Sequence, residues 1–519
     1  MDCRRSSFLH CALPFIKLYY MVSFLLTSSD MKPIPRNTMP ARPLSFSVLI
    51  IMLALPGCVS SAVDRPAATP RAIATLASDQ ILGGGEAAFP QDRWWTRYGD
   101  ATLDGLMAEA VQSAPDLAIA TARLRAADAL AMQAGAARAP MAEADANIGF
   151  SKQSYNMGIP AAFVPKGLLD VGQISLGLAF DPDLWGRNKA ALAAARGDAA
   201  AARVDAAQAR LMLETGLALA WSDLSQIWAE HDVLSHSVAL RTDTLRLSQQ
   251  RKAAGLDTRA DIELAEARLA SARADLAALD EALALSRNRI AALIGAGPDR
   301  GTALPRPALA WSADTALPAH LAAGLLGRRP DVVAARLRTE AMAQRVKVAK
   351  AAFYPNISLS AMVGLQSLSV SNLLKSDSSI AQFGPALSLP LFDGGLRHGR
   401  LDQAWAGYDE AVARYDGTLI TALREAADAV ASRQWLIPRL AQAREASQSA
   451  GEAARLSRLR FKAGLDNRLQ LLASEDAALS SQRLVAVLEA RAIQLDIMLI
   501  RALGGGFEAP RPPEGTPAP

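Results

Sequence analysis

The chain contains two similar copies of one long unit, and this duplication constrains the fold more than any other feature of the sequence. An offset of 215 residues places Pro115-Asp116 on Pro330-Asp331 without a gap. An offset of 209 residues then places the run 254–257 on 463–466, and both runs read Ala-Gly-Leu-Asp. Copies of about 200 residues are far longer than the ~20–50 residues of a solenoid repeat. The sequence therefore predicts that a whole structural unit is present twice.

Each copy contains a stretch that favours one very long helix. No proline occurs between Pro182 and Pro298. Residues 187–254 are rich in Ala, Leu, Arg and Gln, which predicts a helix on the order of 100 Å long at ~1.5 Å per residue. The second copy predicts the matching helix over 396–463, with a bend where Pro438 interrupts it.

Shorter helices are predicted on both sides of the long one. In the first copy they cover 103–138, where Pro115 begins a new first turn, and 257–293, after a turn at Gly255. The two short helices together match the long helix in length. We therefore expect one long helix to pack against two short helices stacked end to end.

Between the helices, apolar residues alternate with small or polar residues. The alternation is clear in 174–180 and 357–365 and weaker in 144–150 and 383–391. A period of two indicates strands with one apolar face. A membrane barrel needs at least ~8 strands and tolerates no open edge in lipid. Four strands per chain therefore predict that several copies close the sheet together, and three copies would supply twelve strands.

The N-terminal region predicts export. An apolar run of about a dozen residues, 44–55, follows three basic residues between positions 32 and 42. This layout is typical of a secretory signal, and the run is shorter than the ~20 residues that span a bilayer. The run ends in Leu-Pro-Gly-Cys at 55–58, which resembles the lipobox of bacterial lipoproteins. The resemblance implies that Cys58 carries lipid and becomes the first mature residue; an unmodified signal-peptide cysteine is the alternative.

Charge and motif content exclude several classes of function. The 55 Lys+Arg and 51 Asp+Glu residues are interspersed, so no basic face for nucleic acid is expected. All three cysteines lie within the first 58 residues, which leaves the body without a thiol for a disulfide or a Cys-based zinc site. No HExxH, Gly-x-Ser-x-Gly or Walker motif occurs. We expect no enzyme, no cofactor and no metal site.

These patterns predict a mainly α chain with a membrane β part and an internal duplication. The predicted segments are an upstream segment with signal peptide (1–57), a lipid-anchored tail (58–93), the first repeat of helix, two strands and long hairpin (94–302), a linker (303–316), the second repeat (317–506) and a Pro-rich tail (507–519).

Several motifs resemble those of the TolC-like outer-membrane efflux proteins. They are Trp-Trp-Thr-Arg-Tyr-Gly-Asp at 94–100, Asp-Leu-Trp-Gly-Arg at 183–187, Arg-Arg-Pro-Asp-Val at 328–332 and Leu-Pro-Leu-Phe-Asp-Gly-Gly at 389–395. The chain is most similar to the NodT-type lipoprotein branch, which serves resistance-nodulation-division pumps. The resemblance implies a homotrimer with a twelve-stranded outer-membrane β-barrel, continued across the periplasm by a long α-helical barrel.

The same resemblance implies a passive exit duct for small molecules such as drugs or toxic compounds. Its implied partners are a periplasmic adaptor (membrane fusion) protein and an inner-membrane pump of the resistance-nodulation-division type. Two alternatives stay open. The outer-membrane duct of a type I protein secretion system has the same fold with a different adaptor, whereas a periplasm-spanning structural lipoprotein would need no strands.

The turns of the helical hairpins are the candidate functional positions. In this family the hairpin tips meet the adaptor, and the matching residues here are Gly255, Leu256, Gly464 and Leu465. An ordinary helix turn, with Gly as the cap and Leu covering the helix seam, explains the same residues.

Two acidic residues follow these turns. Asp466 and Asp257 match residues that line the closed periplasmic aperture in family members. A helix N-cap is the alternative explanation for both. Symmetry-related carboxylates around a narrow mouth would repel anions and attract cations.

Overall fold

The computed structural model describes residues 67–76, 82, 88–156, 160–310 and 321–509. All of them belong to one compact unit, 62–519. The predicted signal peptide and Cys58 lie outside the described residues.

Two helices of equal length confirm the duplication. Helix α6 (Arg187–Ala253) and helix α11 (Leu396–Lys462) each contain 67 residues. Each begins directly after a glycine in the left-handed region, Gly186 at φ +70° and Gly395 at φ +92°. Helix α11 runs through Pro438 without a break. One missing backbone N–H does not end a helix that is packed along its length, and the bend at Pro438 stays a prediction.

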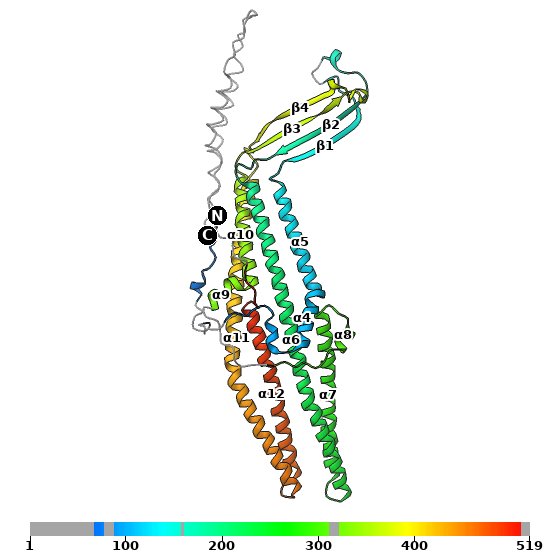
Figure 1. Ribbon diagram of the computed structural model, residues 1–519, viewed down its shortest axis with the longest axis vertical. Helices are drawn as coiled ribbons and strands as arrows, with labels where there is room; N and C mark the ends of the chain where they lie inside the picture. Colours follow the sequence, from blue (N-terminus) through cyan, green and yellow to red (C-terminus); the bar gives the residue numbers. More distant parts are fainter. Residues whose placement is uncertain (1–66, 77–81, 83–87, 157–159, 311–320, 510–519) are drawn as a thin grey trace, which may run out of the picture. The chain divides into compact units, whose positions relative to one another are not determined.

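The shorter helices flank the long ones (Figure 1). They are α4 (Ala101–Ser113), α5 (Pro115–Ala136), α7 (Arg259–Leu293), α8 (Pro298–Thr302), α9 (Leu321–Arg328), α10 (Pro330–Ala351) and α12 (Arg468–Ala502). Helices α5 and α7 both pack against α6, as predicted, and α10 and α12 both pack against α11. Among the described residues, no helix combines the length and the apolar character that a bilayer-spanning helix requires.

Four strands form one antiparallel sheet in the order β1-β2-β3-β4. They are β1 (Met141–Ser151), β2 (Leu169–Phe180), β3 (Asn356–Ser367) and β4 (Ser379–Ser388). Strand β4 begins and ends earlier than the predicted 383–391. Pro385 lies inside β4, which is possible because β4 is an edge strand of the sheet.

The register gives the sheet two different faces. Leu176 of β2 pairs with Val363 of β3, and Leu178 pairs with Ala361. Pairing then assigns further large apolar side chains to this face, namely Ile148, Phe150, Ile174, Leu359, Phe383 and Leu387. The opposite face carries Glu143, Asp145, Asn147, Gln173, Ser175, Ser360 and Gln382. Phe383 is 85% exposed, so no other described part of the chain covers this residue of the apolar face.

The order of the strands matches the order of the helices that adjoin them. Strand β1 follows α5, β2 precedes α6, β3 follows α10 and β4 precedes α11. Neighbouring helices α5 and α6, α6 and α10, and α10 and α11 are packed together (Figure 1). The sheet therefore continues into a wall of four helices. In the described part of the chain, the outer edges of β1 and β4 pair with no further strand.

The motif at 94–100 forms hydrogen bonds that connect helices α4, α6 and α12. Asp100 is the N-cap of α4; it accepts hydrogen bonds from the N–H of Leu103 in the first turn of α4 and from Trp221 Nε1 of α6 over 2.8 Å. The Tyr98 hydroxyl donates to Asp496 of α12 over 2.8 Å. Ala308, in the predicted linker, also donates its N–H to Asp100, so residues of this segment pack on the core.

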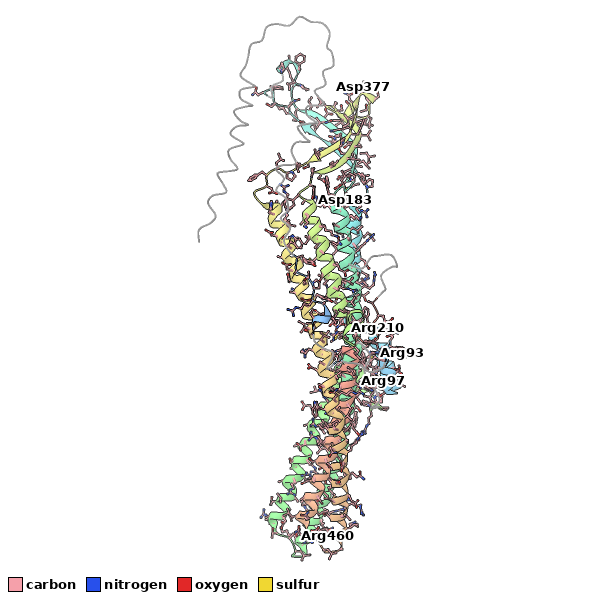
Figure 2. All side chains as sticks on the ribbon, turned by 90° about the vertical axis from the view of Figure 1, so that its left-hand side faces the viewer. Arg93, Arg97, Asp183, Arg210, Asp377 and Arg460 are labelled. Carbon is pink, nitrogen blue, oxygen red and sulfur yellow. The ribbon has the colours of Figure 1, made fainter. Side chains whose placement is uncertain are left out.

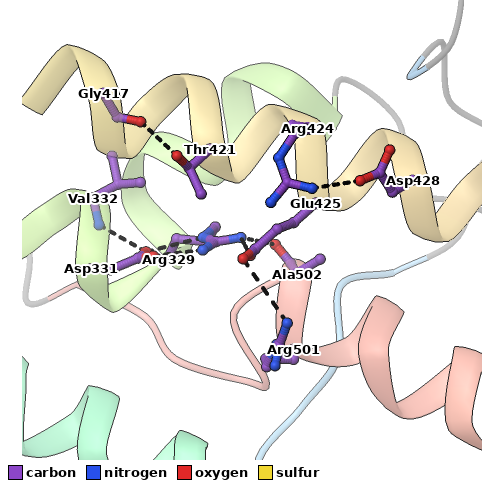
Figure 3. Close-up of polar contacts among 10 residues, drawn as sticks. All are labelled: Arg329, Asp331, Val332, Gly417, Thr421, Arg424, Glu425, Asp428, Arg501 and Ala502. Atoms are coloured by element: carbon purple, nitrogen blue, oxygen red, sulfur yellow. Dashed lines mark hydrogen bonds and ion pairs between the residues drawn. The ribbon is translucent and has the colours of Figure 1, made fainter.

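Arg329, from the motif at 328–332, is a buried cation that joins three helices. Its guanidinium, only 7% exposed, donates to Asp331 over 3.0 Å and to Glu425 of α11 over 2.8 Å. Figure 3 shows it between these carboxylates and the carbonyl of Ala502, which ends α12. Since every charge in this cluster has a partner, the motif stabilises the join of α10, α11 and α12.

Candidate functional site at the hairpin tips

Both hairpins turn through the same backbone motif. Gly255 and Gly464 have φ values of +75° and +71°, in the left-handed region that favours glycine. The N–H of Leu256 donates to the carbonyl of Arg251 over 2.8 Å, and Leu465 donates in the same way to its own helix. This pattern satisfies the free carbonyls at a helix C-terminus. The structure therefore shows the capping role that the sequence suggested for the glycines.

The leucines of the two turns do not cover a helix seam. Leu256 is 66% exposed and Leu465 is 72% exposed. An apolar side chain held in water by a rigid turn is available to a partner. Each chain therefore exposes two equivalent leucine side chains, one at the tip of each hairpin.

The helices after the turns are capped by other residues than the aspartates. Thr258 is the N-cap of α7, and it exchanges hydrogen bonds with Asp261 in a capping box. These bonds from Thr258 lower the pKa of the Asp261 carboxyl. Asn467 is the N-cap of α12 and accepts from the N–H of Gln470. The N-cap explanation of Asp257 and Asp466 is therefore wrong.

Asp257 joins the two hairpins. Its carboxylate is nearly buried and accepts hydrogen bonds from Arg251 Nε over 3.0 Å and from Arg468 Nη1 over 3.1 Å. Arg468 begins α12, and its other terminal nitrogen donates to the carbonyl of Thr244 on α6 over 2.7 Å. One guanidinium of the second hairpin thus binds both the turn and the α6 arm of the first.

Among the described residues, Asn467 and Arg460 of its own hairpin are the polar partners of Asp466. Its carboxylate lies 3.5 Å from Arg460 Nε and accepts the N–H of Asn467 over 2.9 Å. Figure 2 shows Arg460 at the end of the helices farthest from Asp377, which lies in the loop between β3 and β4. Asp466 is therefore located at the extreme end of the helices, beside one cation.

Two further ion pairs connect α6 and α12 farther from the tips. Arg241 contacts Asp476 over 2.9 Å, and Arg483 donates to Glu230 over 2.7 Å. A cleft of about 140 Å³ between α6, α7 and α12 separates the first of these pairs from the Asp257 site. Polar pairs therefore link the two hairpins of one chain near the tips.

The sequence did not predict the arginines that pair with Asp257 and Asp466. The available signal is that Arg468 falls on Arg259 at the offset of 209. The two arginines nevertheless differ, since Arg259 is exposed and pairs with Glu263 of its own helix. In the part of the chain that the structure describes, no group of three or more His, Cys, Asp or Glu side chains is arranged to hold a metal ion.

This arrangement defines a class of protein, the outer-membrane channel subunits with two long helical hairpins and a four-stranded sheet. The crystal structure of the outer membrane protein VceC from Vibrio cholerae matches with a TM-score of 0.76 and 40% identity, covering 81% of this chain and 100% of that chain. The family model described as outer membrane efflux protein matches residues 106–296 and 321–505. The chain belongs to the outer membrane efflux protein family.

Curated relatives agree with this assignment. The fusaric acid resistance protein FusA of Burkholderia cepacia is 34% identical over 370 residues, which are 70% of this chain and 69% of that protein. The outer membrane protein OprJ of Pseudomonas aeruginosa is 30% identical over 488 residues, 90% of this chain and 96% of that protein. The predicted family, the mainly α, internally duplicated fold class and the function as an outer-membrane component of an efflux system are confirmed.

Proposed function

We propose that three copies of this chain form a passive exit duct for drug-sized or toxic small molecules across the periplasm and the outer membrane. The observation that carries the proposal is the four-stranded sheet, which has one exposed apolar face, two open edges and a helix continuing each strand. Lipid covers the apolar face in this arrangement. Neighbouring copies cover the edges.

A closed barrel requires more than one copy, and the family resemblance implies three. Four strands leave the edges of β1 and β4 without partners, and open edges are not tolerated in lipid. Three copies give twelve strands, above the ~8 of the smallest membrane barrels. Because the helices follow the strand order, the same closure forms a barrel of helices below the sheet.

The inner surface of this duct is polar. The face of the sheet opposite the apolar one carries Glu143 and Asp145 on β1 and Gln173 on β2. Farther along the wall, the ion pairs Arg345–Asp198 and Arg338–Asp205 link α10 to α6. A polar, water-filled duct has no need for catalytic groups, and the chain acts without catalysis or a cofactor.

The tips are the docking site for a periplasmic adaptor of the membrane fusion type, through Gly255, Leu256, Gly464 and Leu465. The exposure of both leucines on rigid turns supports this role. Asp466 and Asp257 set the charge and the closure of the aperture. The inner-membrane partner is a pump of the resistance-nodulation-division type, in keeping with relatives named for multidrug resistance and fusaric acid resistance.

Lipid on Cys58 adds an anchor to the membrane insertion of the sheet. The lipobox at 55–58 is the support for this modification.

Mass photometry and planar-bilayer recording of the detergent-purified chain test the duct. We expect trimers that insert and conduct ions through a water-filled pore. A stable monomer with folded strands, or trimers that never conduct, would exclude the proposal.

A further inference from the structure

A cleft lies where the first turns of α6 meet the last turns of α10. We call it the junction cleft; it has a volume of about 540 Å³ and is lined by Lys189 of α6 and by Lys347 and Lys350 of α10. Gln344 adds an amide. Neither the tips nor the duct wall described above uses these side chains.

An aromatic pair forms one wall of the junction cleft. The rings of Trp185 and Tyr354 stack with centroids 4.9 Å apart and an interplanar angle of 17°. Trp185 Nε1 donates to the carbonyl of Pro355 over 2.6 Å, which fixes the indole. The same two rings line an adjoining pocket that reaches Ile357, the first residue of β3 on the apolar face. The cleft therefore lies directly at the base of the apolar face.

The junction cleft lies on the side of the wall opposite its ion pairs. Val333 and Leu337 of α10 belong to an apolar cluster with Phe507. At ~100° per residue, Lys347 falls within ~40° of Val333 around the helix. Arg345, which pairs with Asp198, falls ~120° away. Lys347 therefore lies on the side of α10 that contacts the C-terminal segment, away from Arg345 and its ion pair.

The ammonium groups of Lys189 and Lys347 are available to an anion. Within the described residues, no carboxylate forms an ion pair with Lys189 or Lys347. Asp183, the nearest carboxylate in sequence, already accepts the backbone N–H groups of Asn188 and Lys189 over 2.8 and 2.7 Å. Because Asp183 already accepts these backbone N–H groups, the N-terminus of α6 is not left to bind an anion. The ammonium groups of Lys189 and Lys347 are the groups that would bind it.

We propose that the junction cleft binds the phosphate of an anionic phospholipid from the membrane leaflet around the base of the sheet. The inference rests on the proposed function, because it requires the sheet to lie in a membrane. Lysines and aromatic rings both favour the headgroup level of a bilayer. The ammonium groups of Lys189 and Lys347 bind the phosphate oxygens, and Trp185 and Tyr354 contact the glycerol and the first acyl carbons.

Native mass spectrometry of the detergent-purified full chain with added phosphatidylglycerol or phosphatidylcholine tests the site. The variant is Lys189→Gln/Lys347→Gln, and the matched control is Lys152→Gln/Lys375→Gln, which removes two lysines from loops at the other end of the sheet. At ~1 kcal/mol per lysine near an anionic surface, the preference for phosphatidylglycerol should fall about tenfold or more in the variant. The control should keep the wild-type preference.

Three outcomes would overturn the proposal. They are an unchanged preference in the cleft variant, an equal loss in the control, and displacement of the lipid by millimolar inorganic phosphate, which would make free phosphate the ligand. Trimers that conduct but show no lipid preference would remove this inference alone. Failure to trimerise would instead remove the proposed function.

Discussion

The Asp257 carboxylate accepts a hydrogen bond from Arg468 Nη1 over 3.1 Å, across 211 residues of sequence. This bond joins the tips of two hairpins that have no covalent connection near that end. Both side chains are largely buried, so the contact is protected from screening by salt. A specific ion pair therefore joins the tips of the two hairpins of one chain.

Removing this ion pair should open the periplasmic end. We expect Arg468→Met to raise single-channel conductance in planar bilayers, because a hydrogen bond between charged groups contributes ~1.5–3 kcal/mol. The ratio of open to closed tips should rise about tenfold or more. Asp257→Asn should have the same effect, and the double variant should add little to either.

The control for this experiment is Arg444→Met. Arg444 pairs with Glu489 between α11 and α12 over 2.7 Å, but within one hairpin and in water. Its loss should leave conductance at the wild-type value. Equal conductance of the Arg468→Met and Arg444→Met channels would contradict a closing role for Asp257.

Asp466 should set the ion selectivity of the mouth. Asp466→Ala removes three carboxylates per trimer and leaves Arg460 beside the vacated position. Cation preference, measured as reversal potential under a salt gradient, should therefore fall. Glu263→Ala is the control, since it removes an exposed carboxylate from the side of α7. If both variants shift the reversal potential equally, Asp466 has no aperture role.

Arg329 should be essential for stability. Arg329→Met leaves the carboxylates of Asp331 and Glu425 without their buried partner, which should cost ~3–5 kcal/mol. Arg424→Met, one residue from Glu425, removes an exposed pair with Asp428 and should cost at most ~0.5 kcal/mol. Thermal unfolding in detergent compares the two. Similar melting temperatures for both variants would show that the Arg329 cluster does not stabilise the join.

The Tyr98–Asp496 hydrogen bond should make stability fall at alkaline pH. Burial, and then the Asp496 charge, raise the pKa of the Tyr98 hydroxyl far above its ordinary value. A raised pKa means that its contribution is complete below ~10, the ordinary tyrosine value, and is lost as pH rises above it. Denaturant unfolding at several pH values should show this slope.

The Tyr98→Phe variant distinguishes the loss of stability caused by ionisation of Tyr98 from other effects of alkaline pH. The variant should be less stable at pH 7 by ~1–3 kcal/mol, because Asp496 loses a buried donor. It should also show a weaker decline above pH ~10. Tyr155→Phe, in the loop between β1 and β2, should keep the wild-type slope. A Tyr98→Phe variant that declines as steeply as wild type would refute the assignment.

Lipid on Cys58 should be detectable by labelling cells with a radioactive fatty acid. Cys58→Ser should abolish the label, since serine offers no thiol for diacylglycerol transfer. Each buried CH₂ contributes ~0.8 kcal/mol, so several acyl chains anchor firmly. The unlabelled variant should still insert through its sheet. Persistent labelling would exclude Cys58 as the acceptor.

Local sequence determined much of this protein. The absence of proline across 187–254 and the glycines at positions 186, 255, 395 and 464 set where the long helices begin and turn, because these residues restrict the backbone by themselves. Alternation placed the strands, because side chains on a strand point to opposite faces. The duplication was visible for the same reason, since both copies use the same local signals.

Tertiary structure alone decided how the tips of the two hairpins are joined. Arg259 and Arg468 occupy equivalent positions in the two copies, yet Arg259 pairs with its own helix in water while Arg468 binds Asp257 of the other hairpin. Equivalent local sequence cannot distinguish them. An ion pair depends on distance in space, and only the packing of α12 against α6 brings these charges within 3.1 Å across 211 residues.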